Sequence, residues 1–178
     1  MIHRWLPLLA FLALAALLYV GIRLSEQRDP NAIPSPLIGK PVPQFSLPDF
    51  RDPQRMISDQ DLRGAPYLLN VWGSWCPACR IEHPIITEMA QRGIVRVIGY
   101  NYKDEPADAA RWLQQFGDPY ETIIVDADGR RAIDWGIYGA PESFLVDADG
   151  IVLYKHVGPV TWDTVREEII PRLEGSRQ

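Results

Sequence analysis

The two cysteines of the chain, Cys76 and Cys79, are separated by two residues and follow an apolar run at residues 67–72. A buried strand that leads into a CxxC, with a helix starting at the first sulfur, is the arrangement that makes a thiolate reactive. Pro77 suits the first helical turn, because an N–H at that position has no partner within the helix, and this predicts Cys76 at the N-cap. The pattern therefore predicts dithiol–disulfide exchange through a redox-active Cys76–Cys79 disulfide, with no further cofactor.

The two sulfurs are expected to have different roles. Unpaired N–H groups and the positive end of the helix dipole favour a thiolate on Cys76, and thiol pKa values at such sites run from about 3.5 to 7.5. We therefore expect Cys76 to be the exposed, attacking sulfur. Cys79 lies one helical turn further along and is expected to be more shielded, as the resolving thiol that releases the substrate.

Other uses of a cysteine pair fit less well. A structural disulfide that closes so short a loop contributes only about 2 kcal/mol in the loop-entropy description. A zinc site needs four ligands, and the cysteines with His83 supply three. Haem attachment needs His directly after the second cysteine, where this chain has Arg80. A peroxiredoxin needs Pro and Thr before its cysteine, where Leu69 and Gly73 stand.

Two further patterns exclude other classes of site. The run Val-Asp-Ala-Asp-Gly occurs at 125–129 and again at 146–150. It lacks the third acid and the distal Glu of a calcium loop, and therefore predicts two turns that end strands and no metal site. The net charge of −5 argues against nucleic acid as a partner.

The N-terminal part of the chain predicts a membrane anchor. Every residue from Trp5 to Ile22 is apolar or small, and such a run at helical rise spans about 27 Å, enough for the hydrocarbon core. Small residues do not stand at the −3 and −1 positions of a cleavage site after this run, which favours an uncleaved anchor over a signal peptide. The proline-rich segment that follows favours a stiff linker. We expect a tail at 1–4, the anchor at 5–22, the linker at 23–37 and one domain at 38–178.

Apolar periodicity and turn residues predict a mixed α/β domain with the order βαβαβ followed by ββα. A short helical turn is expected near 59–62. Strands are expected at 45–47, 55–57, 67–72, 95–100, 122–125, 143–146 and 151–156, and helices at 77–91, 107–116 and 161–173.

These features carry a family resemblance. A strand, Trp-Cys-Pro-x-Cys, a helix containing Pro84, then Gly-Ala-Pro at 139–141 before a hairpin and a last helix resembles the thioredoxin fold across residues 38–175. The segments 67–72, 79–83, 99–104 and 138–142 closely resemble the DsbE (CcmG) family, membrane-anchored thiol-disulfide oxidoreductases of cytochrome c maturation.

The resemblance implies an α/β thioredoxin fold with an N-terminal β extension and a helix–strand insertion at 103–126, preceded by one transmembrane helix. It implies a single-pass protein of the bacterial inner membrane with its catalytic domain in the periplasm. Family members accept electrons from a transmembrane thiol reductase and reduce the disulfide of apocytochrome c, directly or through another maturation thiol protein. A general periplasmic thioredoxin-like reductase and a metal-delivery module are the alternatives.

One departure from thioredoxin concerns proton transfer at Cys79. The buried Asp usual six residues before the nucleophile is Asn70 here, and an amide cannot act as a general base. Glu82, one helical turn after Cys79, is the catalytic candidate, with a solvated helix Glu as the alternative. Glu142 is the second candidate acid: the family has an acid beside the groove there, and a surface salt bridge is the alternative.

The resemblance also implies a substrate surface. Pro141 is expected to be a cis-proline, which would expose the Ala140 backbone for strand-like pairing with a substrate. Trp75 and Pro77, on either side of Cys76, are expected to lie on the same surface. Trp72 is interpreted as core, and His83 as structural or solvent-facing rather than as a base.

Overall fold

The computed structural model describes residues 11–19 and 35–176. The chain divides into two units, Met1–Ala32 and Ile33–Gln178. Residues 11–19 of the first unit are helical. The predicted tail at 1–4, both ends of the predicted anchor and most of the predicted linker lie outside the described residues. No helix in the described part of the chain is both long enough and apolar enough to cross a membrane.

The second unit is built around a five-stranded sheet with the strand order β5-β4-β3-β6-β7. The central strand β3 (Tyr67–Trp72) runs parallel to β4 (Arg96–Tyr102) and antiparallel to β6 (Glu142–Val146). The edges are β5 (Thr122–Asp126), parallel to β4, and β7 (Val152–Val157), antiparallel to β6. The strand that leads to the cysteines therefore lies in the middle of the sheet.

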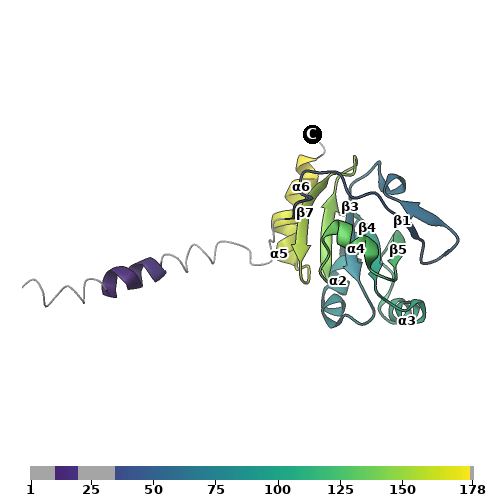
Figure 1. Ribbon diagram of the computed structural model, residues 1–178, viewed down its shortest axis with the longest axis horizontal. Coiled ribbons are helices and arrows are strands. Elements are labelled where there is room, and N and C mark those ends of the chain that lie inside the picture. The colour runs from purple at the N-terminus through teal and green to yellow at the C-terminus, as the bar shows by residue number, and fades with distance from the viewer. Residues whose placement is uncertain (1–10, 20–34, 177–178) are drawn as a thin grey trace, which may run out of the picture. The chain divides into compact units, whose positions relative to one another are not determined.

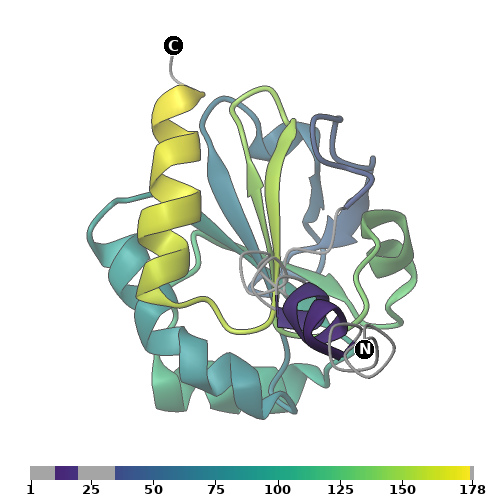
Figure 2. The ribbon, with the colours of Figure 1, turned by 90° about the vertical axis from the view of Figure 1, so that its left-hand side faces the viewer.

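Helices cover both faces of this sheet (Figures 1 and 2). One apolar cluster joins β3 to the helices at residues 77–91 and 106–116 and to the C-terminal helical segments. A second cluster joins β3 to the strand pair at residues 46–58 and to the short helix at residues 130–135. All of β3 is buried because neither of its faces meets solvent, as its continuous apolar run predicts. The helical elements are α2 (Pro77–Gln91), α3 (Pro106–Phe116), α4 (Arg130–Trp135), α5 (Trp162–Thr164), η3 (Val165–Ile169) and α6 (Ile170–Gly175).

The two features expected around the thioredoxin core are present. β1 (Ser46–Pro48) and β2 (Met56–Ser58) form a separate antiparallel pair, followed by a short helix η2 (Gln60–Leu62), and together they are the N-terminal β extension. α3 and β5 are the helix–strand insertion, with β5 at the sheet edge. The predicted elements are therefore confirmed, with ends that differ by one or two residues.

Two details differ from the prediction. Helix α4 was not expected; it is a six-residue helix between Gly129 and Gly136, which have φ angles of 71° and 63°, and it is too short to show a helical period. The predicted last helix at 161–173 is present but contains a π-helical segment, in which the Ile170 N–H donates to the Val165 carbonyl. Pro171 has no N–H and its ring crowds the preceding turn, which accounts for this widening.

Candidate functional site

The nucleophile position is fixed by the turn between β3 and α2. The Cys76 N–H donates to the Gly73 carbonyl at 3.1 Å, and the chain then enters α2 with Cys76 as N-cap and Pro77 in the first turn. Cys76 and Cys79 form a disulfide. The Cys79 N–H has no carbonyl partner within the helix and donates to the Cys76 sulfur at 3.0 Å. It therefore already points at the atom that would carry the thiolate charge. The predicted N-cap is confirmed.

The expected difference in exposure between the two sulfurs is wrong for the oxidised chain. Cys76 and Cys79 are each 2% exposed. The disulfide turns the Cys76 sulfur toward Cys79 and into the apolar cluster that includes Trp72. Cys76 nevertheless lines a cavity of about 540 Å³ together with residues of α3, whereas Cys79 does not. The two cysteines therefore differ in helix position and in access to this cavity.

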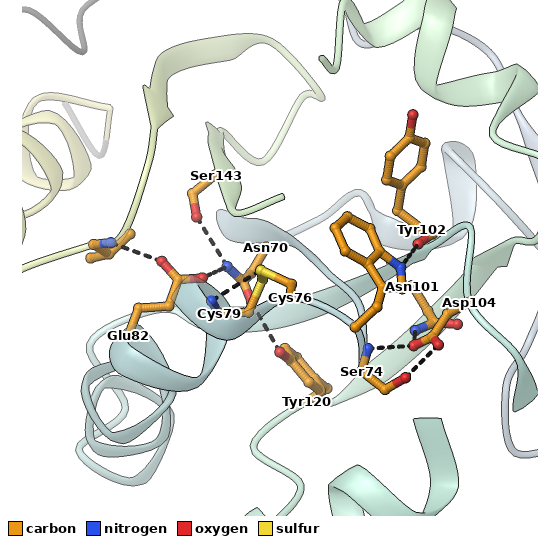
Figure 3. The surroundings of a disulfide bond; sticks show 12 residues. Asn70, Ser74, Cys76, Cys79, Glu82, Asn101, Tyr102, Asp104, Tyr120 and Ser143 are labelled. Carbon is orange, nitrogen blue, oxygen red and sulfur yellow. Dashed lines mark hydrogen bonds between the residues drawn. A yellow bond between two sulfur atoms is a disulfide. The ribbon is translucent and has the colours of Figure 1, made fainter. Parts of the chain in front are cut away.

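A carboxylate that the residue pattern did not identify holds the turn before Cys76. Asp104, which is 8% exposed, accepts from both the N–H and the hydroxyl of Ser74 at 2.6 Å. It also accepts from Asn101 Nδ2 at 2.9 Å (Figure 3). A further hydrogen bond comes from the Glu105 N–H at 3.0 Å. The only sequence signal was the family resemblance of segment 99–104. Asp104 thus ties the end of β3 to the end of β4.

Trp75 is fixed in the same way. Its indole N–H donates to the Tyr102 carbonyl at 3.1 Å, while 48% of the residue is exposed. Pro77 is also exposed, on the other side of Cys76. Both residues line the 540 Å³ cavity, which Trp112 and Phe116 of α3 close on the opposite side. Trp75 and Pro77 therefore lie at the surface next to the nucleophile, as expected.

Glu82 is buried next to Asn70 rather than solvated. It is 1% exposed; Oε1 accepts from Asn70 Nδ2 at 2.7 Å, and Oε2 accepts from the Val160 N–H at 2.8 Å. Burial raises the pKa of Glu82 to about 7, and the two hydrogen bonds oppose part of that rise. The carboxyl can therefore gain or lose a proton close to neutral pH, one helical turn after Cys79.

Asn70 is the centre of a buried network that the sequence did not reveal. Its Nδ2 also donates to Ser143 Oγ at 3.2 Å, and its Oδ1 accepts from the Tyr120 hydroxyl at 2.9 Å (Figure 3). Strand pairing places Asn70 opposite Ser143, and Tyr120 comes from the insertion. Burial, followed by the nearby Glu82 and Asp118, raises the pKa of Tyr120 well above its usual range, so its hydroxyl stays protonated. The amide thus replaces the thioredoxin Asp with a fixed donor to Glu82.

Glu142 lines the groove beside the cis-proline loop, as expected, and forms an ion pair that is buried and not at the surface. It is 1% exposed and lies 2.8 Å from Lys155 Nζ, which is itself buried. Its other oxygen accepts from the Tyr138 N–H at 2.7 Å and the Gly139 N–H at 3.2 Å. The strand position explains this, because Glu142 is the first residue of β6, inside the sheet. Glu142 therefore fixes the loop at residues 138–141 and is no surface salt bridge.

The peptide bond between Ala140 and Pro141 is cis, as expected. Both residues line a cavity of about 350 Å³, together with Ala78 of α2 and Glu142. The loop therefore lies next to the first turn of the CxxC helix. It can present its backbone to a substrate there, as the sequence predicts.

Two residues near the cysteines are structural, as expected. Trp72 is fully buried and its ring lies 5.6 Å from that of Tyr120, nearly parallel. His83 is 4% exposed, and its Nε2 lies 3.1 Å from the Gly117 carbonyl. Burial lowers the pKa of His83, so the neutral ring that donates to this carbonyl is favoured near pH 7.

A disulfide at a helix N-cap after a central strand, beside a cis-proline loop and in a sheet of this order, defines a thiol-disulfide oxidoreductase of the thioredoxin fold. The Redoxin family model matches residues 37–169. Among solved structures, a Chlorobium tepidum protein described as a thiol:disulfide interchange protein DsbE superimposes with a TM-score of 0.66 at 30% identity. This match covers 76% of the present chain and 97% of the other.

Full-length relatives give the narrower assignment. The thiol:disulfide interchange protein DsbE of Allochromatium vinosum is 51% identical over 93% of this chain and 90% of its own length. DsbE of Escherichia coli K12 is 45% identical over 95% and 92%. The chain belongs to the DsbE (CcmG) family of thiol:disulfide interchange proteins.

Proposed function

We propose that this protein is a periplasmic reductant in cytochrome c biogenesis, which reduces the disulfide of apocytochrome c, directly or through another maturation thiol protein, before haem is attached. The observation that carries the proposal is the Cys76–Cys79 disulfide beside the cis-Pro141 loop, in a chain whose DsbE relatives match over more than nine-tenths of its length. An oxidising compartment keeps a dithiol reduced only if electrons are supplied. We infer that a transmembrane thiol reductase supplies them.

The exchange proceeds in two displacements at sulfur. In the reduced protein, the Cys76 thiolate attacks one sulfur of the substrate disulfide; a mixed disulfide forms and the other substrate sulfur leaves as a thiolate, which takes a proton from water. Cys79 then gives its proton to Glu82 and attacks the Cys76 sulfur. The Cys76–Cys79 disulfide forms, the second substrate thiolate leaves and is protonated, and two electrons have passed to the substrate.

Glu82 suits the second displacement. A general base works best when its pKa lies near the operating pH, and burial places the pKa of Glu82 at about 7. Both oxygens accept from fixed N–H groups, of Asn70 and Val160, so the carboxylate is held in place between turnovers. Trp75, Pro77 and the backbone of Ala140 and Pro141 would contact the substrate on either side of Cys76, with Glu142 holding the cis-proline loop.

We further propose that residues 5–22 anchor the protein in the bacterial inner membrane, with residues 1–4 in the cytoplasm and the domain at 38–178 in the periplasm. The apolar composition of that run supports this. The full chain should sediment with membranes, and a chain that starts at Ile38 should be soluble and redox-active. Mature protein that begins after residue 25 would show a cleaved signal peptide instead.

The function is tested in a strain that lacks the protein. We expect loss of c-type cytochromes that retain haem covalently, recovery on addition of an external thiol reductant, and no complementation by Cys76→Ser. Trapping with Cys79→Ser should capture the acceptor as a mixed disulfide. Normal c-type cytochromes together with impaired reduction of many other periplasmic proteins would favour a general reductase. Metal loss from a cuproprotein would favour a metal-delivery module.

A further inference from the structure

Tyr120 belongs to the insertion, where it lies between α3 and β5, and its side chain reaches the buried side of the site. It lies fifty positions along the chain from Asn70, yet its hydroxyl donates to Asn70 Oδ1 at 2.9 Å. Within the described residues this is the one hydrogen bond of that hydroxyl. Tyr120 does not line the cavity beside Cys76. Its hydroxyl therefore acts on the site through Asn70.

The Asn70 amide has two possible orientations, which differ in what they present to Glu82. In the observed one, Nδ2 donates to Glu82 at 2.7 Å and to Ser143 Oγ at 3.2 Å. If the amide were turned by 180°, its oxygen would lie against the Glu82 carboxylate and its NH₂ against the Tyr120 oxygen. The oxygen of Tyr120 could accept from that NH₂, but the Tyr120 hydroxyl proton would lose its only acceptor among the described residues. The Tyr120 hydroxyl therefore selects the orientation in which Asn70 donates to Glu82.

We propose that Tyr120 is a positioning residue for Glu82: its hydroxyl fixes the Asn70 amide so that Nδ2 faces the carboxylate, and the insertion thereby controls the protonation of the acid beside Cys79. The role of Glu82 as the base for Cys79 belongs to the proposed function. The effect of Tyr120 on the Glu82 carboxyl does not depend on it.

Tyr120 is itself held on several sides. Its ring lies 5.6 Å from the Trp72 ring at an interplanar angle of 12°. Its carbonyl accepts from Arg51 Nη2 at 2.7 Å, and its N–H donates to Asp118 Oδ1 at 3.1 Å. A Cβ on Gly99 would lie 3.0 Å from the ring. A hydroxyl carried on so fixed a ring can hold one amide orientation.

Other charged groups near Glu82 are engaged elsewhere. In the described part of the chain Glu82 forms no ion pair. On α2, His83 contacts the Gly117 carbonyl. On β7, Lys155 pairs with Glu142, and His156 Nε2 contacts the Pro159 carbonyl. The groups that contact the Glu82 carboxyl are thus the Val160 N–H and the Asn70 amide, with Tyr120 behind that amide.

The test measures the Glu82 carboxyl directly. The oxidised full chain is labelled with ¹³C at the glutamate carboxyl carbon, Glu82 is assigned by its loss in Glu82→Gln, and its signal is titrated. Tyr120→Phe should raise the proton affinity of Glu82 about threefold and Asn70→Ala about tenfold, because an N–H donor to the ionised form is weakened or lost. Tyr67→Phe is the matched control, since the Tyr67 hydroxyl is buried without a hydrogen-bond partner among the described residues; it should leave Glu82 unchanged.

A second measurement separates the inference from the proposed function. Cys76 is loaded with 5-thio-2-nitrobenzoate, and the colour released when Cys79 attacks is followed against pH. The pH of half-maximal release should rise about as much in Tyr120→Phe as the Glu82 titration does. If Glu82 shifts and the release curve does not, the positioning role of Tyr120 stands and Glu82 is not the base. If Glu82 titrates in Tyr120→Phe as in the unaltered chain, the inference is overturned.

A measurement on the unaltered protein keeps the inference testable if the variants do not fold. Proton–proton contacts of the Asn70 amide show its orientation. Contacts between the Asn70 NH₂ protons and the Ser143 side chain support the inference, and contacts with the hydroxyl end of the Tyr120 ring refute it.

Discussion

Glu82→Gln should change how the stability of the folded domain depends on pH. The pKa of Glu82 is about 7 in the folded chain and close to its ordinary value of 4.5 in the unfolded chain. Below about pH 4.5 the carboxyl is protonated in both states. Between about pH 4.5 and 7 the unfolded chain releases this proton and the folded chain keeps it. The stabilising contribution is therefore present at low pH and is lost as the pH rises through about 7.

The size of the effect follows from the gap between the two pKa values. At about 1.4 kcal/mol per pKa unit, that gap corresponds to about 3 kcal/mol. Gln cannot titrate, so the free energy of unfolding of Glu82→Gln should lack this dependence on pH. The substitution also places an NH₂ group where one oxygen accepts from an N–H of Asn70 or Val160, which lowers stability by about 1–3 kcal/mol at every pH.

The assay is urea unfolding of the oxidised protein at intervals from pH 4.5 to 8, for both chains. The quantity to compare is the difference between the two free energies of unfolding. Burial lowers the pKa of His83, but both chains carry this residue, so its contribution cancels in the difference. We expect the advantage of the Glu82 chain to shrink by about 3 kcal/mol toward pH 7. A difference that does not change with pH would refute the claim that burial keeps Glu82 protonated in the folded chain.

Three further predictions concern the sulfurs and the two buried acids that hold loops. In the reduced protein, Cys76 should be alkylated before Cys79 and should titrate below the usual thiol pKa of about 8.5; faster alkylation of Cys79 would reverse the assigned roles. Asp104→Ala leaves buried donors without an acceptor and should lower the free energy of unfolding by about 3 kcal/mol in urea titrations. An unchanged urea midpoint would show that Asp104 does not stabilise the turn before Cys76. Lys155→Met leaves Glu142 buried without its partner and should cost about 3–5 kcal/mol. Adding Glu142→Gln should restore most of this loss, and strictly additive losses would argue against a coupled pair.

The sequence located α2 to the residue because its start depends on local chemistry. An N-cap side chain followed by Pro77 determines where that helix begins, whatever the rest of the chain does. Helix α4 depends on two left-handed glycines seven positions apart and is too short to show a helical period. The π-helical segment before Pro171 was equally hidden, because the apolar pattern of the last helix continues through it.

The contacts of Glu82 and Glu142 show what residue types and spacing do not predict. Spacing placed Glu82 one turn after Cys79, but did not indicate its hydrogen bond inside the fold with the Val160 N–H, 78 positions along the chain. Glu142 lies at the groove, as expected, but the sequence did not indicate its buried ion pair, because the partner Lys155 lies on the neighbouring strand. Each contact requires the register of the whole sheet, which residue types and spacing do not specify.

The insertion serves both sides of the disulfide through one set of aromatic rings. Trp112 of α3 lines the cavity next to Cys76, and its ring lies 5.0 Å from that of Trp72. Trp72 stacks in turn on Tyr120, whose hydroxyl bonds to Asn70. Rings in contact cannot shift independently in a close-packed core. The wall that would face a substrate and the hydroxyl that orients the partner of Glu82 are therefore parts of one rigid cluster, and a substitution that repacks Trp112 should be felt at Glu82 as well as at the cavity.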